Sequence, residues 1–217
     1  MSIRILLADD HGIVRQGLRS LLEKEPDIEV VGEADDGRKA LGLVRELLPD
    51  VIVMDVAMPN LNGADATRRI VREFPKVKVI ALSMHSSRAF VADMLKAGAS
   101  GYILKECPVD ELIKAIRAVA AGDKHLSSKV TGVVVSDYVK RLSGGTESPL
   151  ETLTAREREV LQLISEGKNT KHIALQLHVS TKTIEANRRK IMEKLDAHSI
   201  AELVKIAILG GLTSLEL

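Results

Sequence analysis

The sequence has few of the residues on which several classes of protein depend. Of its 217 residues one is cysteine and none is tryptophan, and aromatic side chains make up 2%. A single cysteine, Cys107, cannot form an internal disulfide, and no spaced Cys/His cluster suggests a zinc site. Scarce aromatics argue against single-stranded nucleic acid, which is usually held by stacking. The cysteine usage fits a reducing cytoplasm.

Long apolar segments are also missing. No stretch approaches the roughly 20 residues that a helix needs to cross a bilayer. The N-terminus lacks the charged start, apolar stretch and cleavage site of a secretion signal. We therefore expect a soluble, cytoplasmic protein without a membrane partner. At 217 residues the chain is long enough for two domains with ordinary hydrophobic cores.

A large charge of either sign is absent too, since the net charge is +1. This value at first argues against a nucleic-acid partner. The segment from Thr181 to Leu195, however, has five cationic and two acidic residues, a local charge of +3 (5 − 2). Because the positive charge is concentrated there, the sequence remains compatible with binding to duplex DNA.

What the sequence does contain is an alternation of apolar runs and helical patterns over its first 121 residues. The β-rich runs are Ile3–Ala8, Ile28–Gly32, Val51–Met54, Val77–Leu82 and Gly101–Leu104. The expected helices are His11–Lys24, Gly37–Leu47, Ala64–Glu73, Ser87–Ala97 and Val109–Ala121. This rhythm predicts an α/β fold, a doubly wound (βα)5 parallel sheet of the flavodoxin-like kind with strand order 2-1-3-4-5.

The rest of the chain predicts a linker and a second, all-α domain. We expect the first domain over residues 1–125, a linker over 126–149 with a helix from about Ser128 to Leu142, and the second domain over 150–217. Expected helices there are Thr154–Glu166, Thr170–Leu177, Thr181–Leu195 and Ser199–Leu209. Three residues separate the second and third of these helices, which is typical of a helix-turn-helix.

Acidic side chains end two strands that the predicted order makes neighbours. Asp9 and Asp10 follow the first run, and Asp55 follows the third. The carboxyl ends of such strands meet at one edge of the sheet. Three carboxylates there would repel one another unless a cation lay among them, and an all-oxygen site suits Mg²⁺. A simpler alternative is that Asp9 or Asp10 caps the following helix.

A cation and a hydroxyl group reach the same edge. Ser83 ends the fourth strand and Lys105 follows the fifth. Together with the acids, they predict a phosphoryl-transfer site. Asp55 would be the nucleophile that forms an aspartyl-phosphate, Mg²⁺ would neutralise the transferring oxygens, and Lys105 and Ser83 would bind the product oxygens.

These residues lie in the segments LLADDH, DVAMPNLNG, ALS and GYILK, which resemble the receiver domain of two-component response regulators over about Ile3 to Ala121. Glu106 departs from the pattern of many receivers, which have proline there. The resemblance implies these roles: phosphoacceptor for Asp55, metal-binding acids for Asp9 and Asp10, backbone metal ligand for Ala57, switch hydroxyl for Ser83, switch aromatic for Tyr102 and phosphate-pairing lysine for Lys105.

The segment LTAREREVLQLISEGKNTKHIALQLHVSTKTIEANRRKIMEKL resembles the LuxR-type helix-turn-helix domain, and the whole chain is similar to NarL/FixJ-class response regulators. Independently, Ile184, Ile191 and Leu195 form an inward stripe, so the charged side chains face outward or sideways and the helix could enter a major groove. Arginines suit guanine edges, and lysines suit phosphates. The expected DNA contacts are Lys182, Thr183, Glu185, Ala186, Arg188, Arg189 and Lys190.

Two positions on this helix and one stripe on the last helix leave alternatives open. Asn187 replaces a histidine often found in the family. Glu185 could accept a hydrogen bond from cytosine or reject other bases. The target sequence therefore cannot be copied from relatives. Ile200, Leu203, Val204 and Ile208 form an apolar stripe that is either core or a dimer face.

The leading hypothesis is a cytoplasmic transcription regulator whose Asp55 accepts phosphate from a histidine kinase. The receiver then releases or dimerises the DNA-binding unit, giving an active homodimer. The chain would not be a metabolic enzyme, since a receiver catalyses only its own phosphorylation and dephosphorylation. A second hypothesis is a Mg²⁺-dependent phosphohydrolase, although Val56 and Ala57 lack the second aspartate that such hydrolases use. A third is a DNA-binding protein whose intact pocket is not a switch.

Overall fold

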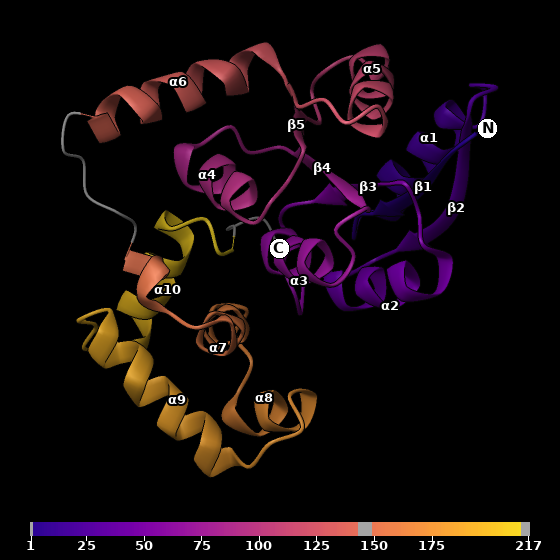
Figure 1. The fold of residues 1–217 in the computed structure, drawn as a ribbon. Helices are drawn as coiled ribbons and strands as arrows, with labels where there is room; N and C mark the ends of the chain where they lie inside the picture. Colours follow the sequence, from indigo (N-terminus) through magenta and orange to yellow (C-terminus); the bar gives the residue numbers. More distant parts are fainter. Residues whose placement is uncertain (1, 143–148, 214–217) are drawn as a thin grey trace. The chain divides into compact units, whose positions relative to one another are not determined.

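The computed structural model describes residues 2–142 and 149–213 (Figure 1). Two compact units make up the chain, residues 1–143 and 144–217. Across the described ranges, no helix is both long and apolar enough to pass through a membrane.

A parallel sheet forms the centre of the first unit. Its strands are β1 (Ile3–Ala8), β2 (Ile28–Ala34), β3 (Val51–Asp55), β4 (Lys78–Ser83), β5 (Gly101–Leu104) and β6 (His125–Leu126). They follow the order β2-β1-β3-β4-β5-β6, which confirms the predicted order of the first five. The sequence did not predict β6, because a strand of two residues is too short to show a periodic pattern of apolar side chains. It pairs with β5, and the next residue, Ser127, donates its N–H to the Tyr102 carbonyl at 3.0 Å.

Helices cover both faces of this sheet (Figure 1). Residues Ile5 and Leu7 of β1 belong to the cluster that holds α1 (Gly12–Leu22) and α5 (Val109–Ala120). Leu6 and Ala8 belong to the opposite cluster. That side is covered by α2 (Gly37–Leu47), α3 (Gly63–Glu73) and α4 (Arg88–Lys96). Burial on both faces explains why the strand sequences are continuously apolar.

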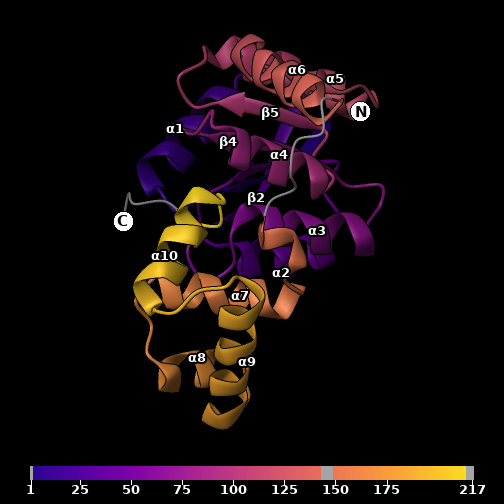
Figure 2. The same ribbon diagram turned by 90° about the vertical axis from the view of Figure 1, so that its left-hand side faces the viewer.

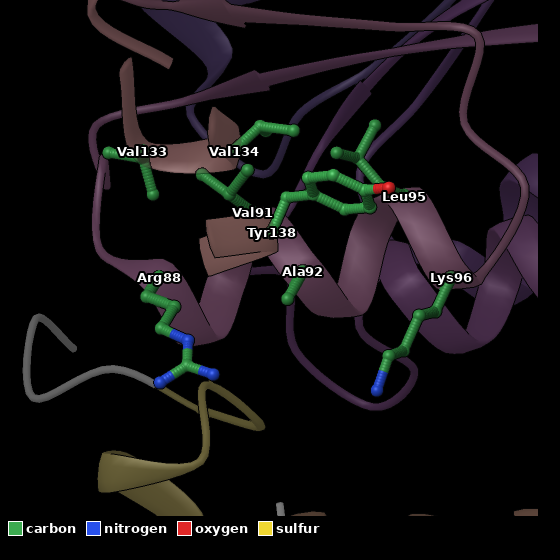
Figure 3. Close-up of a pocket in the computed structure, with 8 residues that line it drawn as sticks. All are labelled: Arg88, Val91, Ala92, Leu95, Lys96, Val133, Val134 and Tyr138. Carbon is green, nitrogen blue, oxygen red and sulfur yellow. The ribbon is translucent and has the colours of Figure 1, made fainter. Parts of the chain in front are cut away.

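The helix expected in the linker is α6 (Ser128–Leu142), and it packs on the first unit. Val130 is fully buried in the core cluster of α2, α3 and α4, and Val133 and Val134 pack against it. Figure 3 shows Val133, Val134 and Tyr138 facing α4 across a groove of about 220 Å³. The first half of α6 therefore contacts the sheet domain, whereas Tyr138 and Val139 in its second half are 64% and 55% exposed.

The second unit is a small helical bundle (Figure 2). A 3-10 turn, Pro149–Thr152, precedes α7 (Ala155–Ser165), α8 (Thr170–Gln176), α9 (Thr181–Lys194) and α10 (Ile200–Leu209). Leu161, Ile184, Ile191 and Leu203 lie in its buried core.

Local signals explain the ends of these helices. Thr154 and Glu157 form a capping box at α7, and Asn169 and Ser180 cap α8 and α9. Gly167 follows α7 with φ 76°, a left-handed conformation that suits glycine.

Candidate functional site

The three predicted carboxylates meet at the carboxyl edge of the sheet. Asp9 and Asp10 directly follow β1, and Asp55 is the last residue of the neighbouring β3. Ligand atoms of Asp9, Asp10, His11 and Asp55 all lie within 4.8 Å of one another. The simpler capping alternative is wrong for α1, whose N-cap is His11 with no side-chain capping bond.

Lys105 bridges two of these acids from the end of β5. Its Nζ lies 2.8 Å from Oδ2 of Asp55 and 2.7 Å from Oδ2 of Asp9. Burial raises the pKa of Asp55, and the nearby Asp9 carboxylate adds to this, whereas Lys105 opposes it. Burial lowers the pKa of Lys105, but the attraction of Asp55 and Asp9 outweighs it, so the net shift is upward. The ammonium group is therefore held charged between the two carboxylates.

Ser83 and Tyr102 converge on the backbone of His85, in the loop between β4 and α4. The Oγ of the buried Ser83 accepts a hydrogen bond from the His85 N–H at 3.0 Å. The Tyr102 hydroxyl donates to the His85 carbonyl at 2.7 Å. Tyr102 is fully buried, which raises its pKa to about 12. The His85 ring stacks on Phe90 of α4 at 4.4 Å, so both polar side chains are connected to that helix.

Two supporting residues escaped the sequence analysis. A Cβ on Gly63 would lie 2.1 Å from the carbonyl oxygen of Asp55, so only glycine lets α3 begin this close to the end of β3. The glycine that ends the DVAMPNLNG segment was a signal for this approach. Arg15 of α1 donates to the Asp9 carbonyl at 2.6 Å and to Glu33 at 2.9 Å, which braces the end of β1. No local pattern marks that role.

The donor set fits a divalent cation. Three carboxylates and one ammonium group leave a formal charge of −2 (−3 + 1) at a partly buried site. The donors are oxygen atoms, apart from the exposed His11, whose Nδ1 lies 2.8 Å from Oδ1 of Asp10. Ala57 lies beside them, with its N–H 3.3 Å from Oδ1 of Asp55. Oxygen ligands and excess negative charge are what Mg²⁺ prefers.

On α9 the structure separates an inner from an outer face. Ile184, Ile191 and Leu195 are buried, as predicted. Arg188 is half-buried and lines a small pocket with residues of α8 and α10. It is therefore less exposed than we expected for a residue that contacts DNA. The other six expected contact residues are exposed: Lys182, Thr183, Glu185, Ala186, Arg189 and Lys190.

The cations on this face are not used to hold the fold. Within residues 149–213, Lys182, Arg189 and Lys190 form no side-chain hydrogen bond or ion pair with another described residue. Lys194, near the end of α9, instead binds Glu157 of α7 at 2.6 Å. Lys182, Arg189 and Lys190 therefore form a basic surface on the second helix of the helix-turn-helix.

The apolar stripe of α10 is only partly core. Leu203 is fully buried, whereas Val204 and Ile208 are half-buried. Ile200 is 50% exposed, and Leu209 at the end of the helix is 69% exposed. This helix therefore presents apolar side chains on both its inner and outer sides.

Comparisons with known proteins cover both units. Residues 5–117 match the response regulator receiver domain family, and residues 151–207 match the luxR family of bacterial regulatory proteins. The transcriptional regulatory protein LiaR of Bacillus subtilis (strain 168) is 45% identical over 89% of this chain and 91% of its own length. The oxygen regulatory protein NreC of Staphylococcus carnosus (strain TM300) is 40% identical over 95% of this chain and 97% of its own.

A similar solved structure is RcsB from Salmonella enterica serovar Typhimurium, bound to promoter rprA in the presence of the phosphomimetic BeF3⁻. It has a TM-score of 0.63 and 28% identity, and covers 95% of this chain and 98% of RcsB.

Proposed function

The chain belongs to the NarL/FixJ class of two-component response regulators, and from this premise we propose that phosphate on Asp55 controls its binding to duplex DNA. It is a transcription regulator that joins a receiver to a LuxR-type DNA-binding domain. The observation that supports the proposal is the bridge from Lys105 to Asp55 and Asp9, because an aspartyl-phosphate site needs two carboxylates and a cation this close together.

In the proposed reaction an Oδ atom of Asp55 attacks the phosphorus of a phosphohistidine on a histidine kinase. The new O–P bond forms as the P–N bond breaks, and the phosphoryl group moves to this chain. Lys105 pairs with one phosphoryl oxygen, and the Ser83 hydroxyl donates to another. Asp9, Asp10, Asp55 and the carbonyl of Ala57 would hold Mg²⁺, which would neutralise negative charge on the phosphoryl oxygens.

The signal then passes through the loop between β4 and α4. A phosphoryl oxygen accepts from the Ser83 O–H, and turning the hydroxyl toward it changes the contact in which the Ser83 Oγ accepts from the His85 N–H. The free energy of the loop conformation that this contact holds therefore changes. The Tyr102 hydroxyl donates a hydrogen bond to the carbonyl of His85, so a change in this loop also changes that hydrogen bond. Phosphate thereby shifts the population of receiver states through contacts that differ between them.

The proposed output is a homodimer on DNA in the cytoplasm, where the promoter lies. Lys182 and its neighbours on α9 contact phosphates and base edges in the major groove. The exposed Ile200 and Leu209 of α10 suit a contact with a second copy.

Acyl-phosphate labelling of the full chain by a small phosphodonor with Mg²⁺ tests the chemical step. We expect Asp55→Ala to abolish labelling, whereas Asp123→Ala, which removes an exposed acid elsewhere on the receiver, should leave it unchanged. Labelling that survives in Asp55→Ala removes this residue from the proposed role.

Two further readouts separate the proposal from its alternatives. Release of many phosphates per chain would favour the hydrolase hypothesis. Equal DNA affinity with and without the phosphodonor would favour a DNA-binding protein whose pocket is not a switch.

A further inference from the structure

One acidic side chain lies within the basic outer face of α9. Lys182, Glu185 and Arg189 are spaced i, i+3 and i+7, so they share one side of the helix, and all three are exposed. The buried Ile184 and Ile191 lie on the other side. Ala186 falls within the exposed stripe, between Glu185 and Arg189. The surface that we propose faces DNA therefore carries a carboxylate near its N-terminal end.

Glu185 has no structural task that would explain this position. Among the described residues none forms an ion pair or hydrogen bond with its carboxylate, although Arg189 is at the i+4 spacing where such pairs form. Some acids elsewhere in the unit are engaged, since Glu157 binds Lys194 and Glu202 accepts from the His198 N–H. Next to DNA, an unengaged carboxylate repels phosphates and lowers affinity for every sequence, unless a base offers it a hydrogen bond.

The major groove offers few partners to a group that only accepts. Guanine presents two acceptors there, and thymine presents an acceptor and a methyl group. Adenine presents an acceptor beside its amino group, whereas cytosine presents only its N4 amino donor. A carboxylate, which carries no proton to donate at neutral pH, fits cytosine best.

We propose that Glu185 reads the amino group of a cytosine in the target site and rejects other bases at that position. This inference rests on the proposed binding of α9 in the major groove. Arg189 lies about 6 Å further along the helix axis and suits the paired acceptors of a guanine. Successive bases are about 3.4 Å apart, so the guanine would lie about two steps from the cytosine. The small Ala186 leaves room for both longer side chains to reach the base edges.

Selection from a pool of random-sequence duplexes tests this assignment, with the full chain, a small phosphodonor and Mg²⁺ at one fixed salt concentration. The natural chain should select a site with one cytosine whose replacement weakens binding roughly 5- to 150-fold. Glu185→Gln should change that preference to adenine, because a glutamine amide both donates and accepts. Glu185→Ala should lose the preference at that position and bind unselected duplexes more tightly.

Glu193→Ala is the matched control. It removes the same charge from the same helix two turns further on, at another exposed position. We expect it to change affinity for all duplexes by one common factor and to leave base preference intact. Circular dichroism of each variant should show unchanged helix content, since no residue in the described part of the chain forms a hydrogen bond or ion pair with the Glu185 side chain.

Two negative results have different meanings. If the natural chain selects a sequence and both Glu185 variants select the same one, the cytosine assignment is overturned while the proposed function stands. If the natural chain shows no sequence-selective binding with or without phosphodonor, the proposed function fails, and the assignment fails with it.

Discussion

The ion pair between Glu157 and Lys194 connects α7 to α9 beside their shared apolar core, and replacing Glu157 by glutamine isolates its contribution. The Glu157 carboxylate accepts from the Lys194 Nζ at 2.6 Å and from the Thr154 N–H at 2.8 Å. Its side chain is 6% exposed, against 35% for Lys194. Glutamine can keep the capping bond to Thr154, so Glu157→Gln removes mainly the charge that faces Lys194.

The expected magnitude follows from this geometry. A hydrogen bond to a charged group contributes about 1.5–3 kcal/mol, and exposure of the lysine reduces that contribution through solvent screening. We expect a loss of about 1–2 kcal/mol, which is a change of roughly 5- to 30-fold in the ratio of folded to unfolded unit.

The loss should depend on pH. Burial would raise the pKa of Glu157, but its bonds to Lys194 and Thr154 outweigh burial and hold that pKa below its ordinary 4.5. A depressed pKa in the folded state stabilises the fold fully above 4.5, and this contribution disappears as the pH falls through the folded-state value. The natural chain and Glu157→Gln should therefore differ at neutral pH and converge in acid.

Peptide-resolved hydrogen exchange is the suitable assay. Both tyrosines, Tyr102 and Tyr138, lie in the first unit, so tyrosine absorbance does not report on the second. Protection of α7 and α9 should fall roughly 5- to 30-fold in Glu157→Gln and stay unchanged in Glu193→Gln, which alters an exposed acid of α9. An undiminished difference well below pH 4.5, or none at neutral pH, would refute the reasoning.

Three other predictions concern the receiver and the DNA contact. Gly63→Ala should lower the stability of the receiver and slow acyl-phosphate labelling, because the new Cβ would lie 2.1 Å from the carbonyl oxygen of Asp55. Gly17→Ala is its control: it adds a Cβ in open space on α1 and should stabilise the receiver by about 0.5–1 kcal/mol. Val130→Ala should cost the receiver about 2 kcal/mol in urea unfolding followed by tyrosine absorbance, since Val130 is fully buried; no loss would mean that α6 is not anchored there. Lys182→Ala should weaken binding to all duplexes alike and reduce the slope of log affinity against log salt by about 0.9, and an unchanged slope would place this lysine away from phosphates.

Much of the receiver could be predicted because its strands are buried on both faces. Continuous apolar runs such as Ile5 to Ala8 have few other interpretations in a chain that alternates strand and helix patterns. The strand order then placed Asp9 and Asp55 at one edge without any knowledge of side-chain conformation. The position of α6 could not be predicted in the same way, because helical spacing of apolar residues does not indicate which surface the helix packs against.

Details of the site depend on tertiary contacts that have no local signature. Lys105 reaches two acids from a strand that is not adjacent to β1, and only the folded sheet defines that distance. On α9, helical spacing identified the buried stripe, but Arg188 lies at its border and turned out half-buried. On α10, spacing could not reveal that Ile200 remains exposed while Leu203 is enclosed.

The attachment of β6 and α6 determines where the receiver can be cut. The family match ends at residue 117, within α5. A chain truncated there would leave β5 as a bare outer strand with unpaired peptide groups, open to pairing with other chains. It would also expose the apolar surface against which Val130 packs. A receiver fragment that keeps both features therefore includes Val134, which packs against the same core, and a fragment that ends at residue 117 is poor material for measuring its phosphorylation.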